Sequence, residues 1–362
     1  MSMTISQLLN PRVLVALAKR HTSLALIGPP GIGKSSIGRQ FPTILSEATG
    51  FKWGYGEQLA PSLDQPDMRG MCIPTKDANG MPVARYTYPA ILPSREYLAE
   101  HPYGVLFIDE YNQADHLVQK AGASLLLEGI IGDYKLPKGW WVVTASNRMA
   151  DKSGVVRPLM HVINRQCTVE IRPDANALIE WMHANEVHPL APAFVKQMPH
   201  VVFTETMPSE PNPFCTPRSF VSAMRYIEAM VGSSLVVPVD DTTQNLIQGD
   251  IGQGAAASFY GWLKVVNELP SIEEIEHDPM HAKMPPSDRL DAAYVATQMV
   301  IHHANQNNTD KLWLYCERLP KELQVMTAAA LMKKKSGVLL NSAAFGKWIA
   351  TNKVLITSSL MD

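Results

Sequence analysis

In the first half of the chain, the pattern of hydrophobic and polar positions predicts buried strands that each lead into polar residues. Short apolar runs occupy residues 24–27, 105–108 and 140–146. Near-continuous apolar runs of this length are typical of parallel strands that are covered on both faces. A glycine-rich segment, a pair of acids and an asparagine follow the three runs in turn. Because open α/β sheets bind ligands at the carboxyl ends of their strands, these segments mark a candidate site.

Helical signals flank these runs. Asn10 can cap a helix that begins at Pro11, and apolar spacing predicts another helix over residues 115–129. A helix is also expected directly after the glycine-rich segment. Pro42 falls within it, so we expect this helix to bend or restart there.

Two hairpins are predicted in the same half. Asn79-Gly80 separates two alternating runs, which is a hairpin signal, and we place this hairpin at about residues 71–88. Gly-Asp predicts a second hairpin at about residues 129–138. The first could project from the sheet domain, or it could be an ordinary surface excursion.

The second half of the chain predicts helices only. A helical pattern starts near Pro173, and Thr216 can cap a helix from Pro217. Apolar stripes at helical spacing follow, and one of them makes Cys316 a core residue. The stretch 237–254 is predicted to be a loop. We therefore expect an α/β domain over residues 1–172 and a helical lid and C-terminal region over 173–362.

The glycine-rich segment reads GPPGIGKSS and matches the phosphate-loop pattern G-x-x-x-x-G-K-[ST]. Gly28 and Gly33 allow a tight turn whose backbone N–H groups can cradle phosphate oxygens. Lys34 can reach the β- and γ-phosphates, and the Ser35 hydroxyl can hold Mg²⁺. A chance glycine-rich turn is the alternative interpretation. The predicted phosphate-binding residues are Gly28, Pro29, Pro30, Gly31, Ile32, Gly33, Lys34, Ser35 and Ser36.

The polar residues after the other two runs supply the rest of a hydrolytic site. Asp109 is predicted to hold Mg²⁺ together with Ser35, and Glu110 to polarise an attacking water. Asn147 can hydrogen-bond that water or the γ-phosphate, or it can be a structural cap. ATP and Mg²⁺ are the predicted cofactors.

Composition and charge narrow the class of protein. The chain has 362 residues, 46% of them hydrophobic and 18% charged, with a net charge of −2. This balance gives no general basic field for nucleic acid. The four cysteines form no C-x-x-C pair, which fits a reducing compartment. We expect a cytoplasmic protein with no secretory leader and no membrane span.

Several segments together resemble AAA+ ATPases of the MoxR-like group. They are GPPGIGKS, DMRGMCIP with PAILPSREYL, FIDEYNQAD, LLLEGIIGDYKLPKGWWVVTASNR, GVVRPLMHVINR and CTPRSF. The resemblance covers residues 23–226 and implies a P-loop AAA+ fold with a helical lid. Lys34, Ser35, Asp109 and Glu110 fall on the Walker residues, and Asn147 falls on sensor 1.

The resemblance also implies roles for arginines and hairpins. Arg165 falls where the family has a trans-acting arginine finger, with Arg157 as second choice, and Arg218 takes a sensor-2-like position. A surface salt bridge, or a helix-start surface residue for Arg218, is the alternative. The two hairpins resemble the helix-2 insert and the pre-sensor-1 hairpin.

The implied function is ATP hydrolysis by a ring, expected to be a hexamer, that remodels or activates a protein partner. Within the resemblance that partner is often a von Willebrand factor A domain protein. An AAA+ nucleic-acid motor or loader is the alternative, and a slowly hydrolysing scaffold is a third. Three lysines at 333–335 could contact nucleic acid, but lysines that close a helix are the simpler interpretation.

Overall fold

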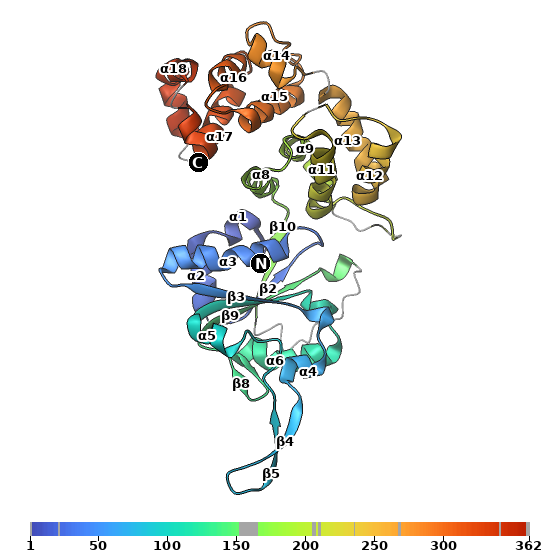
Figure 1. The fold of residues 1–362 in the computed structure, drawn as a ribbon, viewed down its shortest axis with the longest axis vertical. Coiled ribbons are helices and arrows are strands. Elements are labelled where there is room, and N and C mark those ends of the chain that lie inside the picture. The colour runs from blue at the N-terminus through green and yellow to red at the C-terminus, as the bar shows by residue number, and fades with distance from the viewer. Residues whose placement is uncertain are drawn as a thin grey trace. The chain divides into compact units, whose positions relative to one another are not determined.

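The computed structural model describes residues 2–20, 22–151, 166–204, 208, 211–234, 236–266, 269–339 and 342–359. These residues divide into two compact units, the first reaching Asp174 and the second beginning at Ala175. Figure 1 shows the sheet in the first unit and helices in the second. Each unit is described by itself below.

A six-stranded sheet forms the centre of the first unit, and all of its pairings are parallel. The parallel α/β sheet expected from the apolar runs is therefore confirmed. Parallel pairing places the carboxyl ends of all strands at one edge. In spatial order the strands are β1 (Ser2–Thr4), β10 (Cys167–Arg172), β2 (Leu24–Ile27), β9 (Gly139–Ser146), β6 (Tyr103–Asp109) and β3 (Trp53–Leu59).

Helices cover both faces of this sheet (Figure 1). Successive residues of β6 point to opposite faces. Phe107 lies under α3, so close that a Cβ atom at Gly38 would sit 2.4 Å from its ring. Leu106 packs instead in the cluster that contains Leu125 of α6. The helices of this unit are α1 (Ile5–Leu8), α2 (Pro11–Lys19), α3 (Lys34–Thr49), α4 (Gln65–Arg69), α5 (Arg95–Glu100) and α6 (His116–Glu128).

Of the bend or restart expected at Pro42, the restart is wrong. The structure has one helix, Lys34–Thr49, with Pro42 inside it. Proline removes one backbone hydrogen bond and crowds the carbonyl four residues earlier. Here that earlier residue is Gly38, in the segment packed against Phe107, and Phe41 is buried beside the proline. Burial of this helix face therefore outweighs the local cost.

Both predicted hairpins are present. The first consists of β4 (Cys72–Lys76) and β5 (Pro82–Tyr86), and it projects from the sheet in Figure 1. The second consists of β7 (Ile130–Ile131) and β8 (Tyr134–Lys135). The hairpins meet at the base of the first, where Tyr134 Oη donates to the Tyr86 carbonyl at 3.0 Å.

Within its described residues the second unit contains only helices. Two hydrophobic clusters fill it, one around Phe194, Phe220 and Phe259 and one around Trp313 and Cys316, so the prediction that Cys316 is a core residue is confirmed. The helices are α8 (Ala175–Ala184), α9 (Leu190–Gln197), α10 (Pro199–Val202), α11 (Pro217–Val231), α12 (Asp241–Ile251), α13 (Gln253–Val266), α14 (Ile272–His277), α15 (Leu290–His303), α16 (Thr309–Cys316), α17 (Lys321–Leu339) and α18 (Ala343–Ser359).

The predicted loop over 237–254 is wrong, because α12 occupies most of it. Asp240 caps this helix by accepting from the Thr243 N–H at 2.8 Å. Its inner face is buried through Ile247 and Ile251, and Gly252 ends it. The apolar side of α12 is short, so its helical period was hidden among polar residues.

In the part of the chain that the structure describes, no helix combines the length and the apolar character that crossing a bilayer requires.

A buried histidine makes the stability of the second unit depend on pH. His188 is 1% exposed, and its Nε2 lies 3.1 Å from the Ser234 carbonyl. Burial lowers the pKa of His188 from 6.5 to about 4, although the Ser234 carbonyl opposes this shift. The unfolded chain therefore binds a proton that the folded chain does not bind between these two pH values.

We expect the contribution of neutral His188 to the unfolding free energy of the second unit to be largest above pH 6.5 and to decrease as the pH drops toward 4. The share of His188 at pH 5 is about 1–2 kcal/mol. Calorimetric unfolding at pH 7 and pH 5 measures it, and His188→Gln should flatten the pH dependence. The exposed His200 is the control. An unchanged slope in His188→Gln, or an equal change in His200→Gln, contradicts the assignment.

Candidate functional site

The phosphate-loop segment lies between the end of β2 and the start of α3, at the carboxyl edge of the sheet. Gly31 and Gly33 have φ values of 73° and 100°, which favour glycine, so the turn depends on them. The Gly28 N–H donates to the Ser146 carbonyl at 3.2 Å, which fixes the start of the loop against β9. The first N–H groups of α3 therefore open toward this turn, as an anion site requires.

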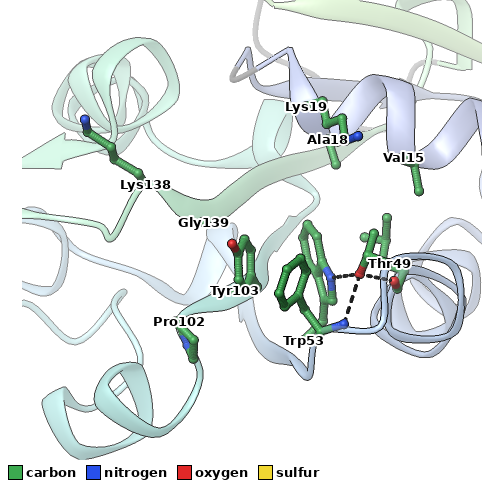
Figure 2. A pocket seen from close by; sticks show the side chains of 11 residues that line it. Val15, Ala18, Lys19, Thr49, Trp53, Pro102, Tyr103, Lys138 and Gly139 are labelled. Carbon is green, nitrogen blue, oxygen red and sulfur yellow. Dashed lines mark hydrogen bonds between the residues drawn. The ribbon is translucent and has the colours of Figure 1, made fainter.

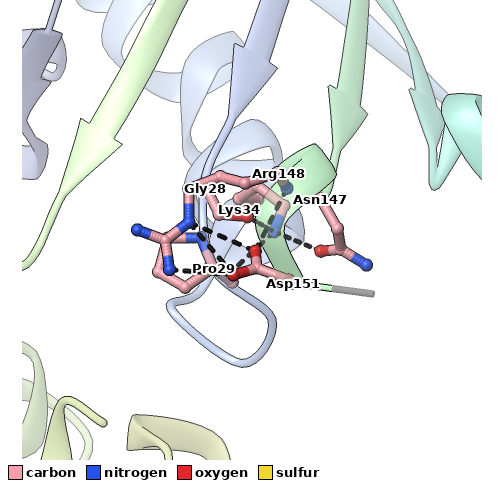
Figure 3. Close-up of polar contacts among 6 residues, drawn as sticks. All are labelled: Gly28, Pro29, Lys34, Asn147, Arg148 and Asp151. Atoms are coloured by element: carbon pink, nitrogen blue, oxygen red, sulfur yellow. Dashed lines mark hydrogen bonds and ion pairs between the residues drawn. The ribbon is translucent and has the colours of Figure 1, made fainter. Parts of the chain in front are cut away.

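Lys34 joins this loop to the neighbouring strand. Its side chain is buried, and Nζ donates to the Gly28 carbonyl at 2.9 Å and the Pro29 carbonyl at 3.0 Å. Nζ also donates to Asn147 Oδ1 at 2.9 Å. Figure 3 shows Lys34 reaching between the loop and Asn147. The ammonium group is thus held at the point where the loop and β9 meet.

Asp109 and Ser35 are brought together at the same edge. Asp109 ends β6, and its Oδ2 accepts a hydrogen bond from Ser35 Oγ at the start of α3. A hydroxyl and a carboxylate are the oxygen ligands that Mg²⁺ prefers. The predicted metal pair therefore comes from two elements that are distant in sequence but adjacent in the fold.

Glu110 directly follows this carboxylate and has an unusual backbone. Its φ is 52°, in the left-handed region, and its N–H donates to Asp109 Oδ1 at 2.9 Å. Its carboxylate makes no hydrogen bond or ion pair with a residue of the described chain. Strain of this kind costs about 1–3 kcal/mol and often occurs at functional sites. The left-handed conformation of Glu110 turns the chain sharply at the end of β6.

Asn147 follows the last residue of β9, and its Oδ1 accepts from Lys34 rather than capping a helix. The next residue, Arg148, forms an ion pair with the buried Asp151 at 2.9 Å, and its own N–H donates to the same carboxylate at 3.1 Å. Figure 3 shows this pair beside the loop. Arg148 therefore fastens the segment that follows Asn147.

Sequence reasoning missed Asn112. This side chain is 4% exposed, and its Nδ2 donates to the Asn147 carbonyl at 2.7 Å. Its Oδ1 accepts from the Asn147 N–H at 3.3 Å. The only signal in the sequence was an asparagine two residues after Glu110, which does not reveal a partner 35 positions away.

Three arginines were also predicted to act at this site. Arg157 and Arg165 lie outside the described residues. Arg218 is the second residue of α11 in the second unit, where the side chain of Thr216 caps the helix and Pro217 begins it. The predicted cap of this helix is confirmed, while the roles of all three arginines stay predictions.

A cavity of about 550 Å³ lies at the opposite edge of the sheet, at the amino ends of β3, β6 and β9. Aromatic side chains form much of its wall. The ring centroids of Phe51 and Tyr103 lie 4.6 Å apart in a stacked arrangement. Trp53 Nε1 donates a hydrogen bond to Thr49 Oγ1 at 3.0 Å (Figure 2). Lys19 and Lys138 also line it. The buried Lys34 and the acids Asp109 and Glu110 are at the other edge, so we assign the candidate site there despite the size of this cavity.

No protein-family model matches the chain, and no curated protein does. Solved structures match most of it at low similarity. A mutant of RuvB from Thermotoga maritima is 16% identical, covering 73% of this chain and 69% of that one, with a TM-score of 0.39. NtrX from Brucella abortus is 14% identical over 93% and 68%, with a TM-score of 0.38. Hsp104 with ATPγS and casein is 14% identical over 72% and 46%, with a TM-score of 0.36.

Because these TM-scores lie below 0.5, the family has to be inferred from the chain's own residues.

The contact between Ser35 and Asp109 predicts a specific dependence on Mg²⁺. We expect Ser35→Ala to reduce, about tenfold, the gain in nucleotide affinity that Mg²⁺ provides, because one oxygen ligand is lost. Titration calorimetry with and without Mg²⁺ measures this gain. Thr43→Ala, which removes an exposed hydroxyl from the same helix, is the matched control. Equal Mg²⁺ dependence in wild type and Ser35→Ala contradicts the metal assignment.

Proposed function

We propose that this protein is an AAA+ ATPase that binds Mg·ATP at the carboxyl edge of its sheet and hydrolyses it. One observation carries the proposal. Lys34, Ser35, Asp109 and Asn147 come from three separate stretches of the chain and are linked pairwise by hydrogen bonds at one edge. Hydrogen bonds that only stabilised the fold would not require the glycine-rich turn that lies beside these residues.

The residues present fit a nucleoside triphosphate with its metal. A cradle for phosphate needs small residues with positive φ, and Gly31 and Gly33 supply them. Lys34 supplies positive charge for the β- and γ-phosphates, while Ser35 and Asp109 supply hard oxygen ligands for Mg²⁺. ATP, when bound, supplies the phosphoanhydride bond that is broken.

The remaining side chains would act on the attacking water. Glu110 has a carboxylate without a described partner, placed one residue beyond the metal-binding Asp109, and it would accept a hydrogen bond from the water. Asn147 would orient the same water or the γ-phosphate. Its Nδ2 makes no hydrogen bond with a described residue, so it is available as a donor. Catalysis of this kind consists mainly of positioning and charge stabilisation.

The MoxR-like subgroup, the ring and the partner rest on the resemblance of the sequence segments. We propose that Arg165, or else Arg157, acts on the nucleotide of a neighbouring subunit, and that Arg218 contacts the nucleotide from the lid. A trans-acting arginine requires a neighbouring subunit, and a hexameric ring is the assembly that the resemblance implies.

The projecting hairpin supports the remodelling of a protein partner. Exposed apolar side chains occur along its length, from base to tip: Met71 is 66% exposed, Ile73 44% and Met81 62%. Exposed apolar side chains on a projecting element are candidate contacts for a protein partner. A von Willebrand factor A domain protein is the partner we propose from the resemblance.

Variants at two site residues should separate binding from hydrolysis. Lys34→Ala is expected to remove tight ATP binding, because the ammonium contacts phosphate in the bound state. Glu110→Gln should keep binding within about threefold and lose hydrolysis by about 10²-fold or more, because only the water loses its acceptor. Glu128→Gln, an exposed change on α6, is the control. Hydrolysis at the wild-type rate in Glu110→Gln would show that another residue activates water.

Mixing variants tests the proposed trans arginine. Arg165→Ala subunits keep an intact phosphate loop, and Lys34→Ala subunits keep an intact finger, so neither should turn over ATP alone. At some interfaces of a mixed ring, an intact Arg165 faces an intact phosphate loop, and partial activity should return. Labelled subunits establish that exchange occurs. If exchange is shown and the mixture stays inactive, Arg157 takes the place of Arg165 in this account.

A further inference from the structure

We infer that Asn112 is a positioning residue for hydrolysis, acting through Asn147. The inference rests on the proposed ATPase function and assigns a role to a side chain outside the predicted site. It follows from a reciprocal hydrogen-bonded pair between this side chain and the backbone of Asn147.

The pair continues the sheet beyond the point where the strands stop pairing. The β6–β9 ladder ends with Ile108 opposite Thr144. Asn147 lies three residues farther on, where β6 has already turned away through the left-handed Glu110. The amide of Asn112 replaces the missing strand, because it offers one donor and one acceptor in the same plane, as a peptide group does.

The chemistry of the pair fixes its orientation. The N–H of Asn147 requires an acceptor and its C=O requires a donor, so Oδ1 and Nδ2 of Asn112 cannot exchange places. Both backbone polar groups of Asn147 are thereby held. The Cα–Cβ direction of Asn147 is set as a result, and Oδ1 meets Lys34 Nζ at 2.9 Å.

The segment that carries Asn112 is itself held firmly. Tyr111 Oη donates to the Gln119 carbonyl at 3.0 Å, and Gln119 Nε2 donates to the Ala114 carbonyl at 3.0 Å. Tyr111 and Gln119 are both buried. Asn112 thus connects a rigid turn after the acids Asp109 and Glu110 to the strand end that carries Asn147.

Because the hydrogen-bonded pair between Asn112 and Asn147 is buried, breaking it costs free energy. Without Asn112, the N–H and C=O of Asn147 lose their partners in a region where Asn147 itself is 7% exposed. An unsatisfied buried polar group costs about 1–3 kcal/mol, and the backbone would shift to recover it. A shift of the Asn147 side chain affects hydrolysis more than ATP binding, because binding draws on many contacts of the phosphate loop.

The experiment is a double-mutant cycle on turnover and nucleotide affinity. Asn112→Ala and the nearly isosteric Asn112→Leu should lower kcat about 10- to 100-fold, with the Kd for ATP changed less than about threefold. Glu128→Gln, the exposed change on α6 named above, is the control, because Glu128 contacts neither Asn112 nor Asn147 in the described structure. Its kcat should stay within about threefold of wild type.

The decisive comparison uses the Asn147→Ala background. If Asn112 acts through the Asn147 side chain, adding Asn112→Ala to Asn147→Ala lowers kcat no further, whereas two independent effects would multiply. Multiplying effects, or an equal loss in Glu128→Gln, overturn the inference and leave Asn112 a stabilising residue only. The ratio of the Kd values for ADP and a slowly hydrolysed ATP analogue, which should fall in Asn112→Ala, gives a second readout that needs no turnover.

The two proposals fail in different ways. Wild-type protein that binds no nucleotide overturns the ATPase function and this inference together. Wild-type protein that hydrolyses ATP, with Asn112→Leu turning over at the wild-type rate, overturns the role of Asn112 alone.

Discussion

The buried ammonium group of Lys34 holds the carboxyl edge of the sheet together. A charge removed from water is tolerated only when hydrogen bonds replace its hydration. An ammonium has three donors, and among the described residues three oxygen atoms accept from this one: two loop carbonyls, of Gly28 and Pro29, and the side-chain oxygen of Asn147. Since these acceptors belong to the loop and to β9, the cation fixes the loop against the neighbouring strand.

This arrangement also prepares the site for an anion. The described acceptors Gly28, Pro29 and Asn147 offer neutral peptide and amide oxygens, and a phosphate oxygen is a stronger acceptor because it is charged. We expect a bound phosphate to compete with Asn147 for the ammonium protons. The side chain of Asn147 would then change partners while its backbone stays paired with Asn112. Binding at the loop and the orientation of Asn147 are coupled by this exchange.

The sequence predicted the parts of the fold whose signals are local. The phosphate loop, the buried strands and both hairpins carry their patterns within a few residues. The continuous α3 was missed, because the burial that offsets Pro42 comes from Phe107 on a distant strand. The helix α12 was missed because its buried side is short, and β1 because three residues, Ser2–Thr4, carry no apolar run.

Some residues of the candidate site could likewise be predicted from local patterns, and others could not. The sequence pattern predicts Lys34, Ser35 and Asp109 as site residues, and the parallel pairing of the strands brings them to one edge of the sheet. The Asn112 pair depends on where β6 stops pairing with β9, which is a property of the folded register and not of any short segment.

A structure of the protein crystallised with Mg²⁺ and a slowly hydrolysed ATP analogue tests the central claim most directly. We predict the triphosphate in the turn between β2 and α3, with Lys34 Nζ on its phosphate oxygens and the metal bound by Ser35 and Asp109. The aromatic cavity at the other edge of the sheet should contain no nucleotide. A nucleotide bound in that cavity, or a phosphate loop that stays empty at saturating analogue, would contradict the account.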